Sequence, residues 1–132
     1  MAVVSGEVKV GFNTVLVALP QLKAGKLKAY LIASNKRFSG VPDIPTATEA
    51  GVRGFESEYW IGLFSPANTP SALVNRLNRE TVEVLQSAAV QDALLAQGAE
   101  PAPGTPAEFA AFIRGETVKL KKLIEVAGIR AE

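Results

Sequence analysis

The chain has 132 residues, of which 48% are hydrophobic and 20% are charged, and its formal net charge is +1. It contains no histidine and no cysteine, which excludes disulfides, thiolate nucleophiles, imidazole bases and metal sites built on His or Cys. The nearly balanced charge gives no bulk electrostatic attraction to nucleic acid. The remaining side-chain chemistry suits binding through hydrogen bonds better than catalysis.

Four segments carry the patterns of β-strands. Apolar and other residues alternate in the first segment, and the later ones are short runs rich in branched or aromatic residues. These predicted strands span residues 8–12, 27–33, 55–65 and, as a short edge strand, 99–102. Because helical patterns separate the strands, we predict an α/β fold with a mostly parallel sheet flanked by helices.

Helical periodicity and terminal residues predict four main helices. The last is long and amphipathic, with a proline at its first position and an apolar stripe along one side. A glycine follows three of the helices, where the left-handed C′ conformation favours it. The predicted helices span residues 15–24, 70–86, 88–97 and 106–127, and the glycines are Gly25, Gly98 and Gly128.

Two Thr-x-x-Glu patterns predict capping boxes, in which a hydroxyl and a carboxylate each satisfy a free backbone N–H. One joins Thr105 to Glu108 at the start of the last helix. The other joins Thr46 to Glu49 and is predicted to open a very short helix, because Gly51 follows closely.

The junction Phe12-Asn13-Thr14 is the most informative local feature, since it lies where a predicted strand ends and a helix begins. Ligands of open α/β sheets gather at the carboxyl ends of strands, and the N–H groups of a helix start attract anions. Asn13 and Thr14 add hydrogen-bond donors, and Phe12 offers a wall for a pocket. The alternative is that Asn13 or Thr14 only caps the helix, which is the commoner role of such residues.

The segment after residue 54 carries two further candidates. Its aromatic cluster includes Trp60, which is a candidate to line a cleft, although core packing is the commoner role of such side chains. Glu56 and Glu58 share one face of the predicted strand and are the candidate pair for acid–base catalysis, although exposed strand carboxylates are far more common. The acidic residues show no metal-loop spacing, and no phosphate-binding or nucleophile motif occurs.

The loops, taken together and in order, are more specific than any one motif. They comprise residues 24–27, 34–37, 41–46, 49–51, 59–70, 98–101, 106–109 and 127–129. This succession strongly resembles the C-terminal part of the substrate-binding receptors of tripartite tricarboxylate transporters, the Bordetella-uptake-type receptors. The resemblance covers essentially the whole chain.

The resemblance implies a type II periplasmic binding protein-like fold, in which two α/β lobes close by a hinge on a small carboxylate or amino acid. It implies a periplasmic solute-binding receptor that delivers its ligand to membrane transporter subunits, with no enzymatic activity and no cofactor. Family members often have Phe-Asp where this chain has Phe12-Asn13, so Asn13 removes a negative charge beside the expected anion. The candidate ligand-binding residues are therefore Phe12, Asn13, Thr14 and Trp60.

The family's receptors are more than twice as long as this chain and begin with a signal peptide, a pattern that the first residues here do not show. We therefore expect a truncated member, with the N-terminal part absent. Residues 1–65 would supply lobe-2 and hinge strands, and residues 66–132 would supply helices that pack back on the first lobe. Exposed apolar surface and strand edges would then favour homo-oligomers.

Two other functions stay open. The first is a ligand-free interaction or assembly module derived from the same fold. The second, which is the least favoured, is a small enzyme that uses Glu56 and Glu58.

Overall fold

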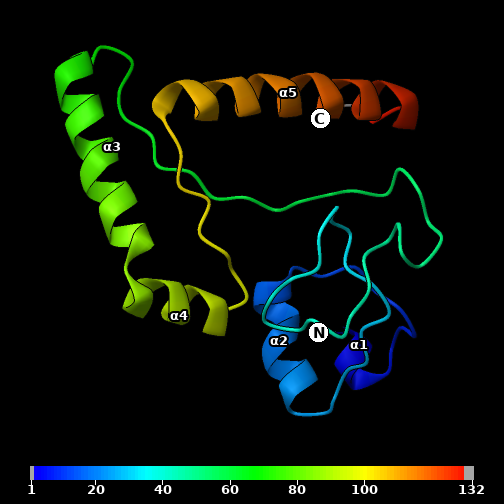
Figure 1. Ribbon diagram of the computed structural model, residues 1–132. Coiled ribbons are helices and arrows are strands. Elements are labelled where there is room, and N and C mark those ends of the chain that lie inside the picture. The colour runs from blue at the N-terminus through cyan, green and yellow to red at the C-terminus, as the bar shows by residue number, and fades with distance from the viewer. Residues whose placement is uncertain (1, 130–132) are drawn as a thin grey trace. The chain divides into compact units, whose positions relative to one another are not determined.

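The structure, a computed structural model, describes residues 2–129, and the helices of that range are joined by extended and turn segments (Figure 1). The chain divides into two compact units. Unit 1 comprises Met1–Phe64 and Ser87–Pro101, and unit 2 comprises Ser65–Gln86 and Ala102–Glu132. The helices are α1 (Ala2–Ser5), α2 (Val15–Lys23), α3 (Ser71–Gln86), α4 (Ala88–Ala96) and α5 (Pro106–Ala127). The assignment of the two halves of the chain to lobes and hinge stays a prediction.

The four predicted strands are not formed as strands in the part of the chain that the structure describes, where the corresponding segments are extended or bent (Figure 1). The helix α1 was also not predicted, and it occupies four residues ahead of the first expected strand. A strand is defined by hydrogen bonds to a neighbouring strand rather than by its own polarity pattern. The pattern therefore identifies segments suited to a sheet, and the pairing decides whether one forms.

Two of the predicted strand segments, 27–33 and 55–65, meet the turn at residues 45–47 around Ile32 in unit 1. The Ile32 N–H donates to the Pro45 carbonyl at 2.8 Å, and the Ile32 carbonyl accepts from the Ala47 N–H at 2.9 Å. These two bonds form a parallel bridge between Ile32 and Thr46. On another segment, the Ser57 N–H donates to the Ala33 carbonyl at 2.9 Å. One parallel bridge is thus present, between a predicted strand and a turn that was not predicted to be a strand.

The buried side chains of unit 1 include one on α2 and two in the turn that bonds Ile32. Leu19 of α2 is 1% exposed, and Phe38 and Ala47 are also buried. Thr46 is the buried polar residue, at 4% exposure, and the predicted capping box satisfies it. Its N–H donates to Glu49 Oε2 at 2.8 Å and its Oγ1 accepts from the Glu49 N–H at 3.2 Å.

The Glu49 carboxylate also anchors the loop that precedes it. Arg37 Nε donates to both carboxylate oxygens, at 2.9 and 3.1 Å, and Arg37 Nη1 donates to the Pro42 carbonyl at 2.8 Å. The hydrogen bond from Arg37, followed by that from the Thr46 backbone, holds the pKa of Glu49 below its ordinary value. The expected short helix is a single turn that ends at Gly51, whose φ is 88°.

The three glycines predicted to end helices all adopt the left-handed conformation. Gly25, Gly98 and Gly128 have φ values of 68°, 84° and 66°. At the end of α4, the Gly98 N–H donates to the Leu95 carbonyl and the Ala99 N–H to the Leu94 carbonyl, both at 3.0 Å. This is the Schellman pattern, which satisfies the last free carbonyls of the helix. The predicted ends of these helices are confirmed.

Unit 2 consists of α3, α5 and their connections. The predicted capping box at the start of α5 is formed, since Thr105 Oγ1 accepts from the Glu108 N–H at 3.2 Å and the Thr105 N–H donates to Glu108 Oε2 at 2.8 Å. Asn78 of α3 donates through Nδ2 to the Gly104 carbonyl at 2.8 Å, which ties α3 to the start of α5.

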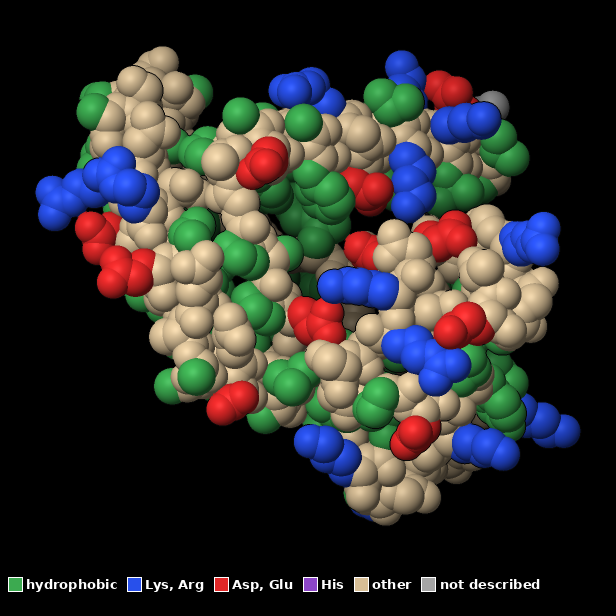
Figure 2. Space-filling model, in the orientation of Figure 1, with side chains coloured by type: hydrophobic (Ala, Val, Ile, Leu, Met, Phe, Trp, Pro, Cys, Tyr) green, Lys and Arg blue, Asp and Glu red, His purple; other side chains and the backbone are tan. Residues whose placement is uncertain are grey.

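The apolar stripe of α5 is only partly covered within unit 2. Figure 2 shows hydrophobic side chains at the surface of α5, between charged ones. Phe109 and Ile113 near its start are half-buried, whereas Leu123 is 59% exposed. The stability of α5 therefore depends strongly on its termini.

Replacing Thr105 by alanine should lower the free energy of unfolding of α5 by about 1 kcal/mol, because it leaves the Glu108 N–H without its cap acceptor. Urea unfolding followed by circular dichroism at 222 nm measures the change. Thr117 is the matched control, since its hydroxyl bonds the Ile113 carbonyl inside the same helix and alanine is a better helix former there. Equal midpoints for T105A and T117A would contradict the capping role.

Candidate functional site

The start of α2 is the predicted binding site, and its first turn is open. The Thr14 carbonyl accepts from the Val17 and Ala18 N–H groups at 3.1 and 3.0 Å. The Thr14 side chain makes no capping hydrogen bond. Within residues 2–129, the Val15 and Leu16 N–H groups consequently have no hydrogen-bond acceptor. Two backbone donors and one hydroxyl at this helix start therefore have no acceptor within the described residues.

The contrast with α5 shows what makes this helix start different. Thr105 and Thr14 occupy the same N-cap position, yet only Thr105 is engaged in a capping box. The first turn of α2 contains no acidic residue, whereas α5 has Glu108 there. The partial positive charge at the N-terminus of α2 is thus not neutralised by a carboxylate of its own turn.

The two residues before Thr14 lie at the surface. Phe12 is 77% exposed, and its ring packs against Phe55 with a centroid distance of 5.3 Å and an angle of 48° between the planes. Asn13 is exposed, and its Nδ2 lies 3.4 Å from the position that a Cβ on Gly11 would occupy. The closer neighbour of that position is Val3 Cγ2 at 2.9 Å, so the absence of a side chain on Gly11 makes room for Val3 rather than for the Asn13 amide.

Trp60 lies on the same extended segment as Phe55, five residues further along. Its side chain is 36% exposed. The ring contact between Phe12 and Phe55 joins the start of α2 to the beginning of this segment. The structure thus brings Phe12, Asn13 and Thr14 together at the open turn, and places Trp60 on a neighbouring segment.

The end of α4 packs directly on the open turn, which the sequence did not indicate. A Cβ added to Gly98 would lie 2.9 Å from the Leu16 nitrogen and 2.9 Å from the Val15 carbonyl carbon. These are backbone atoms, so a side chain at this position would require the helices to move apart. Gly98 was predicted only as the residue that ends α4, and its second role depends on a contact between residues far apart in the sequence.

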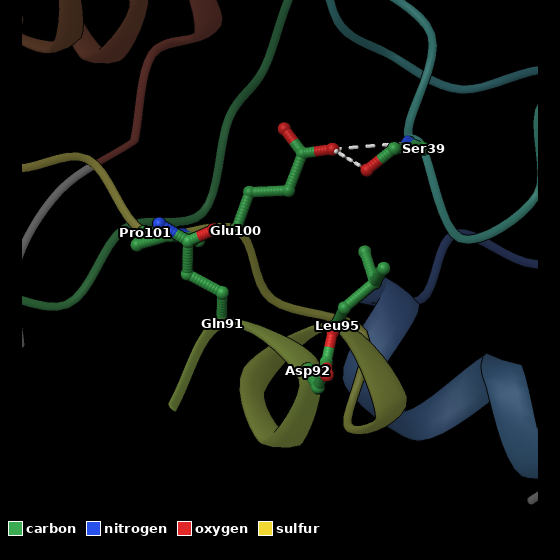
Figure 3. Close-up of a pocket in the computed structure, with 6 residues that line it drawn as sticks. All are labelled: Ser39, Gln91, Asp92, Leu95, Glu100 and Pro101. Atoms are coloured by element: carbon green, nitrogen blue, oxygen red, sulfur yellow. Dashed lines mark hydrogen bonds between the residues drawn. The ribbon is translucent and has the colours of Figure 1, made fainter. Parts of the chain in front are cut away.

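Two residues after Gly98, Glu100 bonds the loop that contains Ser39. Glu100 Oε1 accepts from the Ser39 N–H at 2.9 Å and from the Ser39 hydroxyl (Figure 3). Glu100 Oε2 lies 3.1 Å from Lys36 Nζ. The hydrogen bonds from Ser39, and then Lys36, hold the pKa of Glu100 below its ordinary value of 4.5.

A small pocket of about 240 Å³ adjoins this contact. Figure 3 shows the residues that line it, which are Ser39, Gln91, Asp92, Leu95, Glu100 and Pro101. Sites for small-molecule ligands generally begin at about 300 Å³. Two carboxylates in its wall, Asp92 and Glu100, also disfavour an anionic ligand. This pocket is therefore a poorer carboxylate site than the start of α2.

Glu56 and Glu58, the candidate catalytic pair, bond to two different hydroxyl groups. Thr48 Oγ1 donates to Glu56 Oε1 at 3.3 Å, and Ser34 Oγ donates to Glu58 Oε1 at 2.8 Å. Each bond ties the 55–65 segment to a different neighbouring loop.

In the described range, no group of three or more acidic residues is arranged to hold a metal ion. No helix in that range has the length and hydropathy of a membrane span.

Comparison with known proteins defines the class to which this fold and site belong. The chain resembles solved periplasmic receptors. It is 30% identical to the periplasmic binding protein BugD, with a TM-score of 0.75, over 87% of this chain and 39% of that one. The α/β fold class of periplasmic binding proteins, predicted from the sequence, is therefore confirmed.

The family follows from a match over nearly the whole chain. The family model described as "Tripartite tricarboxylate transporter family receptor" matches residues 1–129, and the chain belongs to this family. Protein BugT of Bordetella pertussis is 31% identical over 125 residues, which cover 95% of this chain and 38% of BugT. The chain thus spans about two fifths of the length of curated relatives that it matches. The family consists of solute-binding receptors rather than enzymes.

Two solved structures of similar proteins contain small dicarboxylates. One is Rpa4515 of R. palustris with adipate, which is 30% identical and has a TM-score of 0.77 over 87% of this chain and 38% of that one. The other is MatC of Rhodopseudomonas palustris with bound malate, which is 36% identical and has a TM-score of 0.71 over 83% of this chain and 38% of that one.

Replacing Gly98 by alanine should destabilise unit 1 more than replacing Gly25. Both glycines have positive φ, so each substitution costs about 1–2 kcal/mol in left-handed strain. Only Gly98 meets backbone atoms, whereas a Cβ on Gly25 has nothing within 4 Å. The overpacking at Gly98 should add about 1–3 kcal/mol. Denaturant unfolding of the two variants measures the difference, and equal losses would refute the close approach.

Proposed function

We propose that this chain supplies part of the ligand site of a periplasmic receptor that captures a small dicarboxylate for the membrane subunits of a tripartite tricarboxylate-type transporter. Its membership of the receptor family and its similarity to structures that hold adipate and malate support the ligand class. The proposed binding residues are Phe12, Asn13, Thr14 and Trp60.

The open first turn of α2 is the observation on which the proposal depends. A carboxylate has two oxygens that can accept several hydrogen bonds, and the turn offers two N–H groups without an internal acceptor. The partial positive charge of a helix N-terminus stabilises an anion in this position. The Thr14 hydroxyl, which is not engaged in capping, is a third donor.

The flanking residues adapt this helix start to a small organic anion. Asn13 is neutral and carries an amide with two donors, so it adds hydrogen bonds without repelling a carboxylate. Phe12 presents an exposed ring that can cover the carbon chain of the ligand. In the proposed receptor, the second carboxylate binds to groups of the opposite lobe, and hinge closure encloses the ligand.

An assembly module that has lost ligand binding is the second candidate. The extended segment after Phe55 favours it, because three of its apolar side chains lie largely in solvent. Tyr59, Ile61 and Leu63 are 72%, 81% and 73% exposed. Such a run is suited to pairing with a second copy of the chain.

Isothermal calorimetry with malate and with adipate tests the proposed site. Thr14→Ala and Asn13→Ala should each weaken binding about tenfold, the loss of one hydrogen bond to a charged acceptor. Thr117→Ala, a threonine change within α5, is the control and should leave the affinity unchanged. If neither Thr14→Ala nor Asn13→Ala alters the affinity, the site assignment is wrong.

The assembly alternative makes a different prediction for the same protein. It predicts no heat of binding with either dicarboxylate and a dimer whose population rises with concentration in sedimentation velocity. A monomer that binds malate would exclude it.

A further inference from the structure

The segment 87–101 belongs to unit 1. In the sequence it is separated from the rest of that unit by residues 65–86, which contain α3. Its attachment to residues 2–64 therefore depends on particular contacts. Two of these lie at neighbouring positions. Gly98 packs on the backbone of Val15 and Leu16, and Glu100 bonds Ser39 and Lys36.

The local backbone links these two contacts closely. The Schellman bonds of Gly98 and Ala99 fix both residues to the last turn of α4. Only one residue separates Gly98 from Glu100. The Glu100 contact and the Gly98 contact therefore lie on one short stretch of backbone that is fixed to the end of α4.

The Glu100 contact is built from two kinds of interaction. Oε1 accepts two hydrogen bonds from Ser39, one from the backbone and one from the hydroxyl. Oε2 faces Lys36, whose side chain is 73% exposed, so this ion pair is screened by solvent and weak. A carboxylate has two acceptor oxygens, so it can bind Ser39 with one and Lys36 with the other. A glutamine has only one acceptor oxygen, so if that oxygen binds Ser39, its NH₂ group faces the Lys36 ammonium.

We propose that Glu100 is a positioning residue for the anion site. Through its bonds to Ser39 and Lys36, it holds the Gly98 turn against Val15 and Leu16 and so fixes the shape of the open helix start. The effect on ligand rests on the proposed function, while the effect on the contact between Gly98 and α2 does not.

The contact can be measured directly by NMR on the uniformly labelled full chain. In the wild type, a nuclear Overhauser effect should connect the Gly98 α-protons to the Leu16 amide proton. Glu100→Gln should abolish it and shift the Val15 and Leu16 amide resonances. Asp92→Asn is the matched control, because Asp92 lines the same pocket but is not part of the Ser39 contact, and it should preserve the signal.

A pH titration separates positioning from general stability. The charged groups that face Glu100 are Lys36 from the loop and Asp92 from α4. As the pH falls through the lowered pKa of Glu100, protonation removes the charge that Ser39 and Lys36 stabilise. The Leu16 amide shift should follow this titration in the wild type and in Asp92→Asn, and not in Glu100→Gln.

Ser39→Ala keeps the test decisive if Glu100→Gln does not fold. It removes only the hydroxyl donor and should weaken the Gly98–Leu16 signal while the helical circular dichroism is retained. A signal of wild-type strength in folded Ser39→Ala or folded Glu100→Gln would overturn the positioning role.

Malate titration of the same samples separates this inference from the proposed function. If malate binds at the α2 start, Glu100→Gln should weaken its affinity about tenfold, and an unchanged affinity would refute the effect on the site. If malate does not perturb the wild-type Leu16 amide, the proposed function fails. The Gly98–Leu16 signal then still decides whether Glu100 positions the turn.

Discussion

The close approach of Gly98 to the first turn of α2 is the contact on which the arrangement of unit 1 depends. It brings the backbone of one helix end against the backbone of another helix start, with no side chain between them. The position therefore requires a residue without a Cβ for two independent reasons, the positive φ of the helix end and the space. The same contact determines what surrounds the free N–H groups of α2.

The starts of α2, α5 and the Thr46 turn differ in how their free backbone N–H groups are bonded. At α5 and at the Thr46 turn, a glutamate three residues after the threonine satisfies the local N–H groups. At α2 the corresponding residue is Val17, so nothing in the turn competes for its donors. An anion can therefore bind α2 without first displacing a carboxylate of the protein.

Local features were predictable from the sequence, and contacts between distant segments were not. The capping boxes of Thr46 and Thr105 and the glycine ends of the helices follow from residues within one turn of each other. The strands were expected from polarity alone, but their formation depends on partners that no local pattern specifies. At the candidate site, the junction Phe12-Asn13-Thr14 was identified because it lies between a predicted strand and a predicted helix. The approach of Gly98 and the bonds of Glu100 join residues more than sixty positions apart, beyond the reach of periodicity.

The position of α3 in the chain has a consequence for the order of folding. Unit 1 is interrupted by residues 65–86, and Glu100 meets Ser39 across 61 positions of sequence. Closing such a loop costs entropy before its contacts form, and contacts of this range slow folding. During synthesis the α2 turn is made early but acquires its neighbour only after α4 has emerged. Until then, the helix start has its two free amide groups but not the neighbouring Gly98 turn that borders them in the folded protein.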